Sequence, residues 1–132
     1  MMRLVLDASA LVAYLLGVRS DRVLTSAVSI RNDLHVPAIC DVEVVSAVSR
    51  EVRRGTLADA DAQMALLDYV SLPIGRHLHT RAIGRGYELR DNFTAADASY
   101  VALAEALGAD LVTLDEALAR AVRRHTGVRV VP

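Results

Sequence analysis

Four acidic side chains stand at positions where they could act together on one bound ion: Asp7, Glu43, Asp97 and Asp115. Two follow short apolar runs and two begin amphipathic stretches, so we expect all four at one edge of a sheet. Carboxylates a few ångströms apart repel one another, and this raises the pKa of each unless they share a cation. Oxygen ligands without imidazole or thiolate suit Mg²⁺ or Mn²⁺, and such ions activate water and neutralise charge in phosphoryl transfer.

Two short apolar runs predict the strands that carry the first and last of these acids. Leu4–Leu6 and Leu111–Leu114 are uninterrupted and apolar, which is typical of strands buried on both faces of a parallel sheet. Asp7 follows the first run and Asp115 follows the second. In open α/β sheets, ligands bind at the carboxyl edge, where strands stop and helices begin with unpaired N–H groups. We therefore expect both carboxylates at that edge.

The amino-terminal part of the chain predicts two helices and a strand. Residues 10–16 are apolar almost all round and precede Gly17, which predicts a helix that ends there and lies in the core or an interface. A weaker helical pattern covers residues 21–31. Residues 35–39 predict a short strand, which Pro37 limits near one end.

Asp41 is the predicted N-cap of the next helix. From there to Gly55, apolar residues recur at helical spacing: Val42, Val45, Val48 and Val52. This periodicity predicts a helix, despite the β-branched side chains that lower helix propensity. Glu43 is then expected in the first helical turn.

Another amphipathic helix is predicted over residues 58–71, followed by a brief extended piece at 72–74. The residues near its apolar stripe are Ala62, Leu66, Tyr69 and Val70.

No clear period runs through residues 75–92. His77 and His79 are two residues apart and cannot share a helix face, which argues against a histidine metal site. Gly84 and Gly86 lack the third glycine and the preceding strand of a dinucleotide site, so we do not expect a Rossmann cofactor.

The carboxyl-terminal third gives the clearest pattern. Thr94 is the predicted N-cap of a helix that ends at Gly108, with Asp97 as its third residue. Its apolar stripe is Tyr100, Leu103, Ala104 and Leu107. The remaining elements are the strand at 111–114, a helix through 117–122 and a strand over 128–131. This order predicts an α/β fold, a three-layer α/β/α single domain with a central, mainly parallel sheet.

Length and composition predict one domain over residues 1–132. The chain is 53% hydrophobic, which is enough for one core, and it is too short for a second. No apolar run approaches the roughly 20 residues that span a bilayer, and no signal peptide is predicted, so we expect a cytoplasmic protein with no membrane partner. Cys40 stands alone and is expected to be buried and inert.

The net charge of −1 gives the chain as a whole no electrostatic attraction for nucleic acid. All 15 basic residues are Arg, however, and many stand in three groups: Arg50, Arg53 and Arg54; Arg76, Arg81, Arg85 and Arg90; Arg120, Arg123 and Arg124. Each group has two interpretations, a solvated helix face or cations that can fork onto phosphate.

Each acid also has a purely structural interpretation. Asp97 with Thr94 fits a capping box, and Glu43 in a first turn complements the helix dipole. Asp7 and Asp115 could each cap the helix that follows. Four acids at matching positions nevertheless favour a shared site.

Four phrases of the sequence resemble PIN-domain ribonucleases of the VapC toxin type: Val5–Ser9, Val36–Ala38 followed by Glu43, Asp97–Ala104, and Leu111–Asp115. The resemblance spans nearly the whole chain, and the order and spacing of the phrases make it specific. It implies a PIN-like α/β/α fold. It also implies a metal-dependent endoribonuclease that hydrolyses RNA phosphodiester bonds as the toxin of a type II toxin–antitoxin pair.

The resemblance also assigns roles to residues. The metal-binding and catalytic residues are Asp7, Glu43, Asp97 and Asp115, supported by Ser9 and Thr113. The implied cofactor is Mg²⁺ or Mn²⁺, and the implied partners are an RNA substrate, a cognate VapB-type antitoxin and a second copy in a homodimer. Ser46 and Ala96 depart from the usual pattern, in which Asn and an aromatic residue are frequent, and this bears on substrate fit more than on the metal.

Two alternatives stay open. A haloacid-dehalogenase-like phosphatase also places Asp after its first strand, but that family has an Asp-x-Asp pattern whose second position is Ser9 here. A catalytically weak PIN module would bind RNA or protein without cutting, although the presence of all four acids argues against it.

Overall fold

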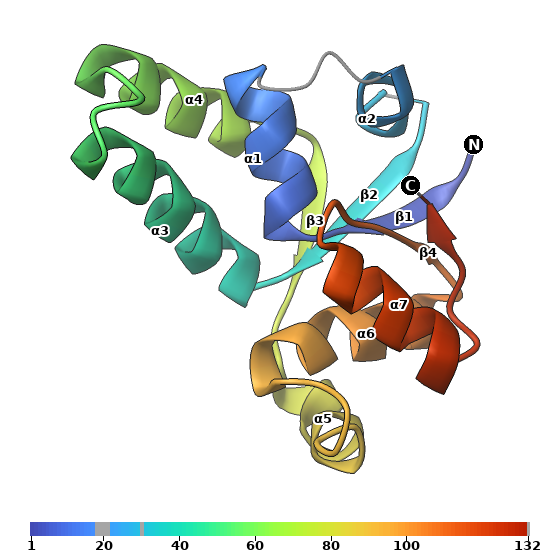
Figure 1. Ribbon diagram of the computed structural model, residues 1–132. Helices are drawn as coiled ribbons and strands as arrows, with labels where there is room; N and C mark the ends of the chain where they lie inside the picture. The colour runs from blue at the N-terminus through green and yellow to red at the C-terminus, as the bar shows by residue number, and fades with distance from the viewer. Residues whose placement is uncertain (18–21, 30, 132) are drawn as a thin grey trace.

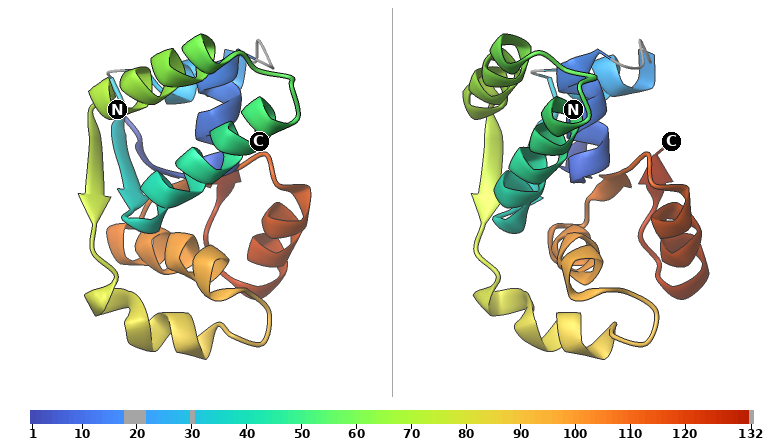
Figure 2. Two further views of the ribbon diagram at one scale, coloured as in Figure 1. Left: turned by 90° about the vertical axis from the view of Figure 1, so that its left-hand side faces the viewer. Right: turned by 60° about the vertical axis from the view of Figure 1, so that its left-hand side comes forward.

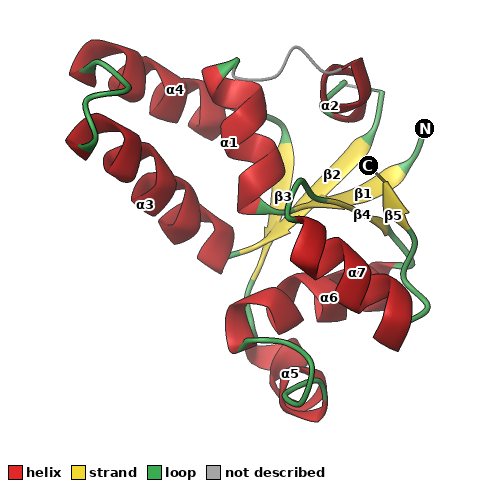
Figure 3. Cartoon of the chain, viewed as in Figure 1, coloured by secondary structure: helices red, strands yellow, loops and turns green. Residues whose placement is uncertain are grey.

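A computed structural model describes residues 1–17, 22–29 and 31–131. Within them, the sheet has five strands in the order β3-β2-β1-β4-β5, and every neighbouring pair is parallel. The strands are β1 Arg3–Leu6, β2 Asp33–Pro37, β3 Ile74–His77, β4 Asp110–Val112 and β5 Val130–Val131 (Figures 1 and 3). The predicted parallel sheet is therefore confirmed.

Helices cover both faces of this sheet (Figure 2). On one side lie α1 Ala8–Leu16, α2 Arg22–Ala27, α3 Ile39–Arg53 and α4 Asp59–Ser71. On the other lie the short 3₁₀ helix η1 Thr80–Ala82 and helices α5 Ile83–Glu88, α6 Ala95–Leu107 and α7 Glu116–His125. The three-layer α/β/α prediction is confirmed. Among the described residues, no helix is both long and apolar enough to cross a membrane.

The order of strand addition reverses at β1. The chain adds β2 and β3 on one side of β1 and then crosses to add β4 and β5 on the other. The backbone N–H of Asp7 donates to the carbonyl of Val112 at 3.0 Å, so pairing between β1 and β4 continues past the end of β1. Such a reversal leaves a crevice outside the carboxyl ends of the two strands. The residues that follow β1 and β4 therefore open onto this crevice.

The centre of the core lies between β1 and the helices on either side. Val5 and Leu6 are 0% exposed, as the middle strand of a covered parallel sheet requires. Helix α6 packs against β1, β2 and β4 and completely buries Ala98 and Val101. This packing fixes the first turn of α6, which carries Asp97, relative to the end of β1.

The predicted ends of two helices are confirmed. Gly17 and Gly108 follow α1 and α6 in the left-handed conformation, with φ of 61° and 60°. Thr94 is the N-cap of α6, and its hydroxyl accepts the backbone N–H of Asp97, the third helical residue. The capping signals in this part of the sequence were therefore sufficient to place α6.

The boundary between β2 and α3 lies closer to the amino terminus than predicted. The strand ends at Pro37 and the helix already begins at Ile39, so the predicted strand over 35–39 is wrong at its end. The N-cap is Ala38, which makes no side-chain capping bond. As a result, Glu43 lies in the second turn of α3, not the first, and its helix-dipole interpretation is wrong.

Asp41 is not the N-cap of α3 but lies inside its first turn. Its carboxylate accepts hydrogen bonds from the Tyr69 hydroxyl at 2.7 Å and from Nε of Arg76 at 2.9 Å. These bonds tie α3 to α4 and β3. The acid preferred at helix caps serves here as a tertiary contact, which no local pattern distinguishes from a cap.

The predicted valine stripe of α3 is confirmed at Val48, which is buried, but not at Val42 and Val45. Cys40, Val44 and Val48 face the core, whereas Val42 is 64% and Val45 is 50% exposed. Because the valines form two stripes on this helix, helical periodicity alone did not identify the one that is buried. Cys40 is buried, as expected.

The segment without a predicted period contains the rest of β3 and all of α5. Strand β3 is short and carries Gly75 and Arg76. Gly75 allows the close approach of His35 from β2, because a Cβ there would lie 3.0 Å from the His35 Nδ1 atom. His77 Nε2 lies 2.9 Å from the same nitrogen. These cross-strand contacts cannot be seen in a single sequence, which is why the predicted extended piece stopped at Ile74, the first residue of β3.

Other boundaries moved by a few residues. Strand β4 covers 110–112 instead of 111–114, β5 covers 130–131 instead of 128–131, and α2 covers 22–27 of the predicted 21–31, of which residues 21 and 30 lie outside the described residues. In α4, Val70 is 72% exposed, and the buried residues are Ala62, Ala65 and Tyr69.

Two valines on α3 test the corrected stripe. We expect Val48→Ala to lower the free energy of unfolding by about 2 kcal/mol, because it removes two buried methyl groups and leaves a cavity. Val45→Ala, on the same helix but half exposed, should change it by less than about 0.5 kcal/mol. Urea denaturation of both variants measures the difference, and equal effects would contradict the observed orientation of α3.

Candidate active site

The four predicted acids line one groove of about 650 Å³ between α1 and α3, which we call the acidic groove. Asp7, Asp97 and Asp115 enter it from the start of α1, the first turn of α6 and the start of α7. Glu43 enters from α3. The groove lies at the carboxyl ends of β1 and β4, where the sequence predicted a shared site.

Asp7 is the buried member of the group, with only 5% of its surface exposed. One carboxylate oxygen accepts the Ser9 hydroxyl at 2.6 Å and the backbone N–H of Ala10 at 3.0 Å. The other oxygen accepts the Thr113 hydroxyl. Burial raises the pKa of Asp7 above its ordinary value, the three hydrogen bonds oppose this, and the charge of Asp115 adds to it.

Ser9 and Thr113 connect the ends of β1 and β4. Each donates its hydroxyl to Asp7, and each also accepts a backbone N–H from the segment after β4. Ser9 accepts from Leu114 at 3.0 Å, and Thr113 accepts from Asp115 at 3.0 Å. The Ser9 hydroxyl thus holds both the acid and the loop that carries Asp115, which a small residue without a hydroxyl could not do.

Asp115 is the exposed member of the group and the N-cap of α7. One of its oxygens accepts the backbone N–H of Leu118 at 3.0 Å. It follows β4 by two residues instead of directly ending the strand, because β4 stops at Val112. The intervening Thr113 is therefore free to reach back to Asp7.

Asp97 is half-buried, and its pKa is raised. Burial is the largest cause, followed by the negative charge of Asp115, and Asp7 contributes further repulsion. A hydrogen bond with Thr94 acts in the opposite direction. The negative charges of Asp115 and Asp7 therefore act on Asp97 in the folded protein.

Glu43 is held by Tyr100, which was predicted only as part of an apolar stripe. The Tyr100 hydroxyl donates to a carboxylate oxygen of Glu43 at 2.5 Å, and both residues line the acidic groove. Tyr100 is otherwise buried at 2% exposure. A buried tyrosine hydroxyl needs a partner, so Tyr100 inside an apolar stripe was a signal for some polar contact, but the sequence does not show that the partner is Glu43 on another helix.

The structural interpretations of the acids turn out to be compatible with a shared site. Asp7 and Asp115 do cap α1 and α7, and Thr94 caps the helix that carries Asp97. Each carboxylate nevertheless lines the groove. A carboxylate has room for about four hydrogen bonds or ligands, so a capping bond leaves capacity for a cation.

The donor set of the groove fits a hard divalent cation in its chemistry. The ligands on offer are carboxylate and hydroxyl oxygens, which suit Mg²⁺ or Mn²⁺. A bound cation would also offset the cost of burying these charges and the repulsion between them, which together raise the pKa of Asp7 and Asp97. In their present conformations, no three His, Cys, Asp or Glu side chains of the described chain gather closely enough to hold one ion. Binding therefore requires side chains to move, and the exposed Asp115 has more freedom to do so than buried Asp7.

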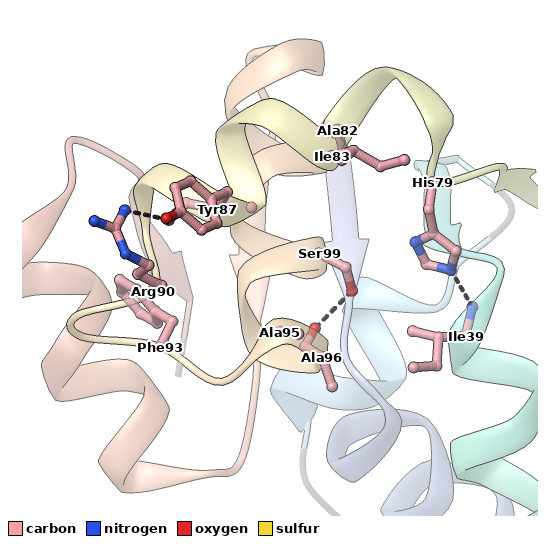
Figure 4. Close-up of a pocket in the computed structure, with 11 residues that line it drawn as sticks. Ile39, His79, Ala82, Ile83, Tyr87, Arg90, Phe93, Ala95, Ala96 and Ser99 are labelled. Atoms are coloured by element: carbon pink, nitrogen blue, oxygen red, sulfur yellow. Dashed lines mark hydrogen bonds between the residues drawn. The ribbon is translucent and has the colours of Figure 1, made fainter.

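A second pocket, of about 460 Å³, lies on the other side of the first turn of α6 (Figure 4). Its lining is mostly apolar, from α5 and the start of α6, with Ile39 and His79 at one end. His79 Nε2 accepts the backbone N–H of Ile39 at 3.1 Å. Ala96 lines this pocket and not the acidic groove, so its departure from the usual pattern does not alter the carboxylate site.

Comparisons with known proteins agree with this arrangement. The model of the PIN domain family matches residues 4–124, nearly the whole chain. The chain belongs to the PIN-domain family. This match excludes the alternative that the chain is a haloacid-dehalogenase-like phosphatase.

Curated relatives of this PIN domain are named as ribonucleases. It is 36% identical to Ribonuclease VapC12 of Mycobacterium tuberculosis over 97% of this chain and 98% of the relative. Ribonuclease VapC9 of the same species is 40% identical over 98% of both chains. Ribonuclease VapC3 of Mycobacterium tuberculosis is 42% identical over 90% of this chain and 87% of the relative.

Solved structures share the fold of this PIN domain. PAE2754 from Pyrobaculum aerophilum superposes with a TM-score of 0.71 at 24% identity, covering 98% of this chain and 83% of that one. VapBC2 from Rickettsia felis, solved bound to a DNA fragment from their promoter, also gives 0.71, at 16% identity and 98% coverage of both chains.

The raised pKa of Asp97 makes stability depend on pH. The pKa of the Asp97 carboxyl is higher in the folded protein than in the unfolded chain, so the carboxyl ionises more easily in the unfolded chain. The metal-free protein therefore loses stability as the pH rises from the unfolded pKa to the folded pKa. Asp97→Asn removes that loss. The unfolding free energy of the variant, relative to wild type, should therefore increase between pH 4 and pH 7 in chelator, as measured by urea denaturation.

The control for this experiment is Asp91→Asn, which removes the same charge at an exposed position outside the groove. It should show no comparable trend with pH. Parallel pH profiles for wild type and Asp97→Asn would contradict the electrostatic coupling of Asp97 to the other acids.

Proposed function

We propose that this PIN domain is a VapC-type, metal-dependent endoribonuclease that hydrolyses RNA phosphodiester bonds as the toxin of a toxin–antitoxin pair. The observation that carries the proposal is the acidic groove, in which four carboxylates line one cavity at the carboxyl ends of β1 and β4. Its support is the 36–42% identity to VapC ribonucleases over nearly the full chain.

Asp7, Glu43, Asp97 and Asp115 are the proposed ligands of Mg²⁺ or Mn²⁺. When bound, the ion lowers the pKa of a water molecule and stabilises negative charge on the phosphate. The site then needs no nucleophile from the protein.

The remaining contacts divide the work among the four acids. Ser9 and Thr113 fix the Asp7 carboxylate, so Asp7 provides a rigid reference point for the site. Tyr100 keeps Glu43 inside the groove, and the exposed Asp115 faces solvent at the groove mouth. The pKa values of Asp7 and Asp97 are raised because their charged forms are destabilised in the metal-free protein. A bound cation would remove part of that destabilisation, and this favours binding.

The rival function is a PIN module that binds RNA or protein without cutting it. No loss of an acid favours that rival here, because all four carboxylates are present and line one groove. Only a measurement of RNA cleavage can therefore distinguish the nuclease from a module that binds without cutting.

Cleavage of a defined single-stranded RNA tests the nuclease. We expect cleavage with Mn²⁺ and none with excess chelator. Asp97→Asn keeps the shape of the side chain and the Thr94 cap but removes the charge, so it should stay folded within about 1 kcal/mol of wild type. Its Mn²⁺ binding by calorimetry should weaken, and RNA cleavage should fall by orders of magnitude.

The matched control is again the exposed Asp91→Asn, which should cleave like wild type. If Asp97→Asn cleaves RNA at close to the wild-type rate, Asp97 has a structural role and at most three acids form the site.

A protein partner follows from the exposed apolar surface as well as from the relatives. The large apolar side chains exposed on α3, α4 and α5 are Val42, Val45, Met64, Leu67, Val70, Ile83 and Tyr87. Apolar surface of this kind marks association sites. We propose that a VapB-type antitoxin and a second copy of the chain cover parts of it, and that an Arg of the antitoxin enters the acidic groove in place of the cation.

The antitoxin is tested by expression. Production of this chain alone should arrest growth, and co-production of the product of the neighbouring reading frame should relieve the arrest and co-purify with it. Failure of both would refute the toxin–antitoxin assignment and leave the nuclease assignment standing.

A further inference from the structure

We propose that Arg50 is a substrate-binding residue whose guanidinium holds an RNA phosphate next to the one that is cleaved. This inference rests on the proposed ribonuclease function and deepens it. It assigns the groove two ends, an acidic end where the strand is cut and a basic end where the strand is held.

Arg50 lies inside the acidic groove, at the end opposite the aspartates. It follows Glu43 by seven residues on α3, so two helical turns separate them and place Arg50 about 10 Å further along the helix. Between them the groove is lined by Ala47 from α3, and by Val12 and Leu16 from α1. The floor between the two ends thus offers no competing charge.

The guanidinium of Arg50 has no hydrogen bond or ion pair within the described part of the chain, although carboxylates are near. Its neighbours three and four positions away on the helix are Ser46, Ala47, Arg53 and Arg54, none of which is acidic. The adjacent Glu51 also lines the groove, but its carboxylate has other partners: it accepts the Thr56 hydroxyl at 2.6 Å and pairs with Arg54 at 3.5 Å.

Other arginines of the former basic groups behave differently. Arg76 is paired with Asp41, and Arg85 binds both oxygens of Glu105 at 2.8 and 3.0 Å. These two serve the fold, which favours the structural interpretation for Arg76 and Arg85. Arg50 combines an unpaired guanidinium with a place in the acidic groove.

A polyanion needs such a cation in a groove lined by five carboxylates, those of the four proposed ligands and of Glu51. A cation held by the acids can neutralise one phosphate, but a strand that lies along the groove brings further phosphates past Ala47 toward Arg50. Phosphate contacts of this kind fix the register of a strand and carry no base specificity. Arg suits the role because its planar fork makes two parallel hydrogen bonds to one phosphate.

The experiment compares Arg50→Gln with Arg53→Gln, a control on the same helix that is exposed but does not line the groove. With single-stranded RNA and Mn²⁺, Arg50→Gln should raise KM about tenfold and leave kcat within about twofold. The slope of log affinity against log salt should fall by about 0.7, the value for one phosphate contact on a single strand. Arg50→Lys should recover part of the affinity.

A neutral linkage locates the contact. Each RNA of a set carries one uncharged methylphosphonate linkage at a different position. Wild type should bind weakly to the RNA whose neutral linkage replaces the contacted phosphate near the cleavage site, and Arg50→Gln should bind that RNA as well as it binds the unmodified one. If both glutamine variants show the wild-type KM and salt slope, the inference is overturned, even where Arg50→Gln weakens an antitoxin complex.

Binding and cutting are measured separately, so the two claims fail differently. Fluorescence anisotropy with the Asp97→Asn background reports RNA binding without cleavage. Binding that depends on Arg50 in a wild-type protein that cuts no RNA would refute the nuclease and support the phosphate contact. Cleavage that is indifferent to Arg50 would do the reverse.

Discussion

The buried carboxylate of Asp7 is the constraint on which the rest of the structure depends. An ionised group at 5% exposure is costly unless donors surround it, and three are present, from Ser9, Ala10 and Thr113. Thr113 lies 106 residues away in the sequence, so satisfying one charge ties the end of β1 to the segment after β4. Cutting that tie would loosen the crevice where the strand order reverses. The hydrogen bonds to Asp7 therefore both stabilise the fold and fix the position of this carboxylate in the groove.

Three helices begin at this crevice, and each brings the positive end of its dipole to the acids. Helices α1, α6 and α7 start within three residues of Asp7, Asp97 and Asp115. Unpaired N–H groups at helix starts favour negative charge, which offsets part of the repulsion among the three carboxylates. The acids can thus coexist in a folded chain that holds no cation, at the expense of a raised pKa at Asp7 and Asp97. The helix starts that are capped here are thus also the places where the proposed metal ligands gather.

The sequence predicted the parts of this arrangement that depend on local chemistry. Buried strands, Gly17 and Gly108 as helix stops, and the Thr94 cap all follow from rules that act over a few residues. Contacts between distant segments could not be predicted in this way. Asp41 was predicted as a cap but is a partner for Arg76. Strand β3 was not predicted beyond its first residue, because its Gly75 is explained only by a histidine on the neighbouring strand. Tyr100 was read as apolar because its hydroxyl partner comes from another helix.

The lateral edges of the sheet restrict how this molecule can associate. The outermost strands are β3 and β5, with four and two residues. So few exposed backbone groups make a poor template for strand addition, and Pro73, directly before β3, has no N–H to offer. A continuous sheet across two molecules is therefore disfavoured, which also guards against fibril-like growth. Association must instead use side chains on the helical layers, where specificity can be encoded and where a partner can leave without unravelling the sheet.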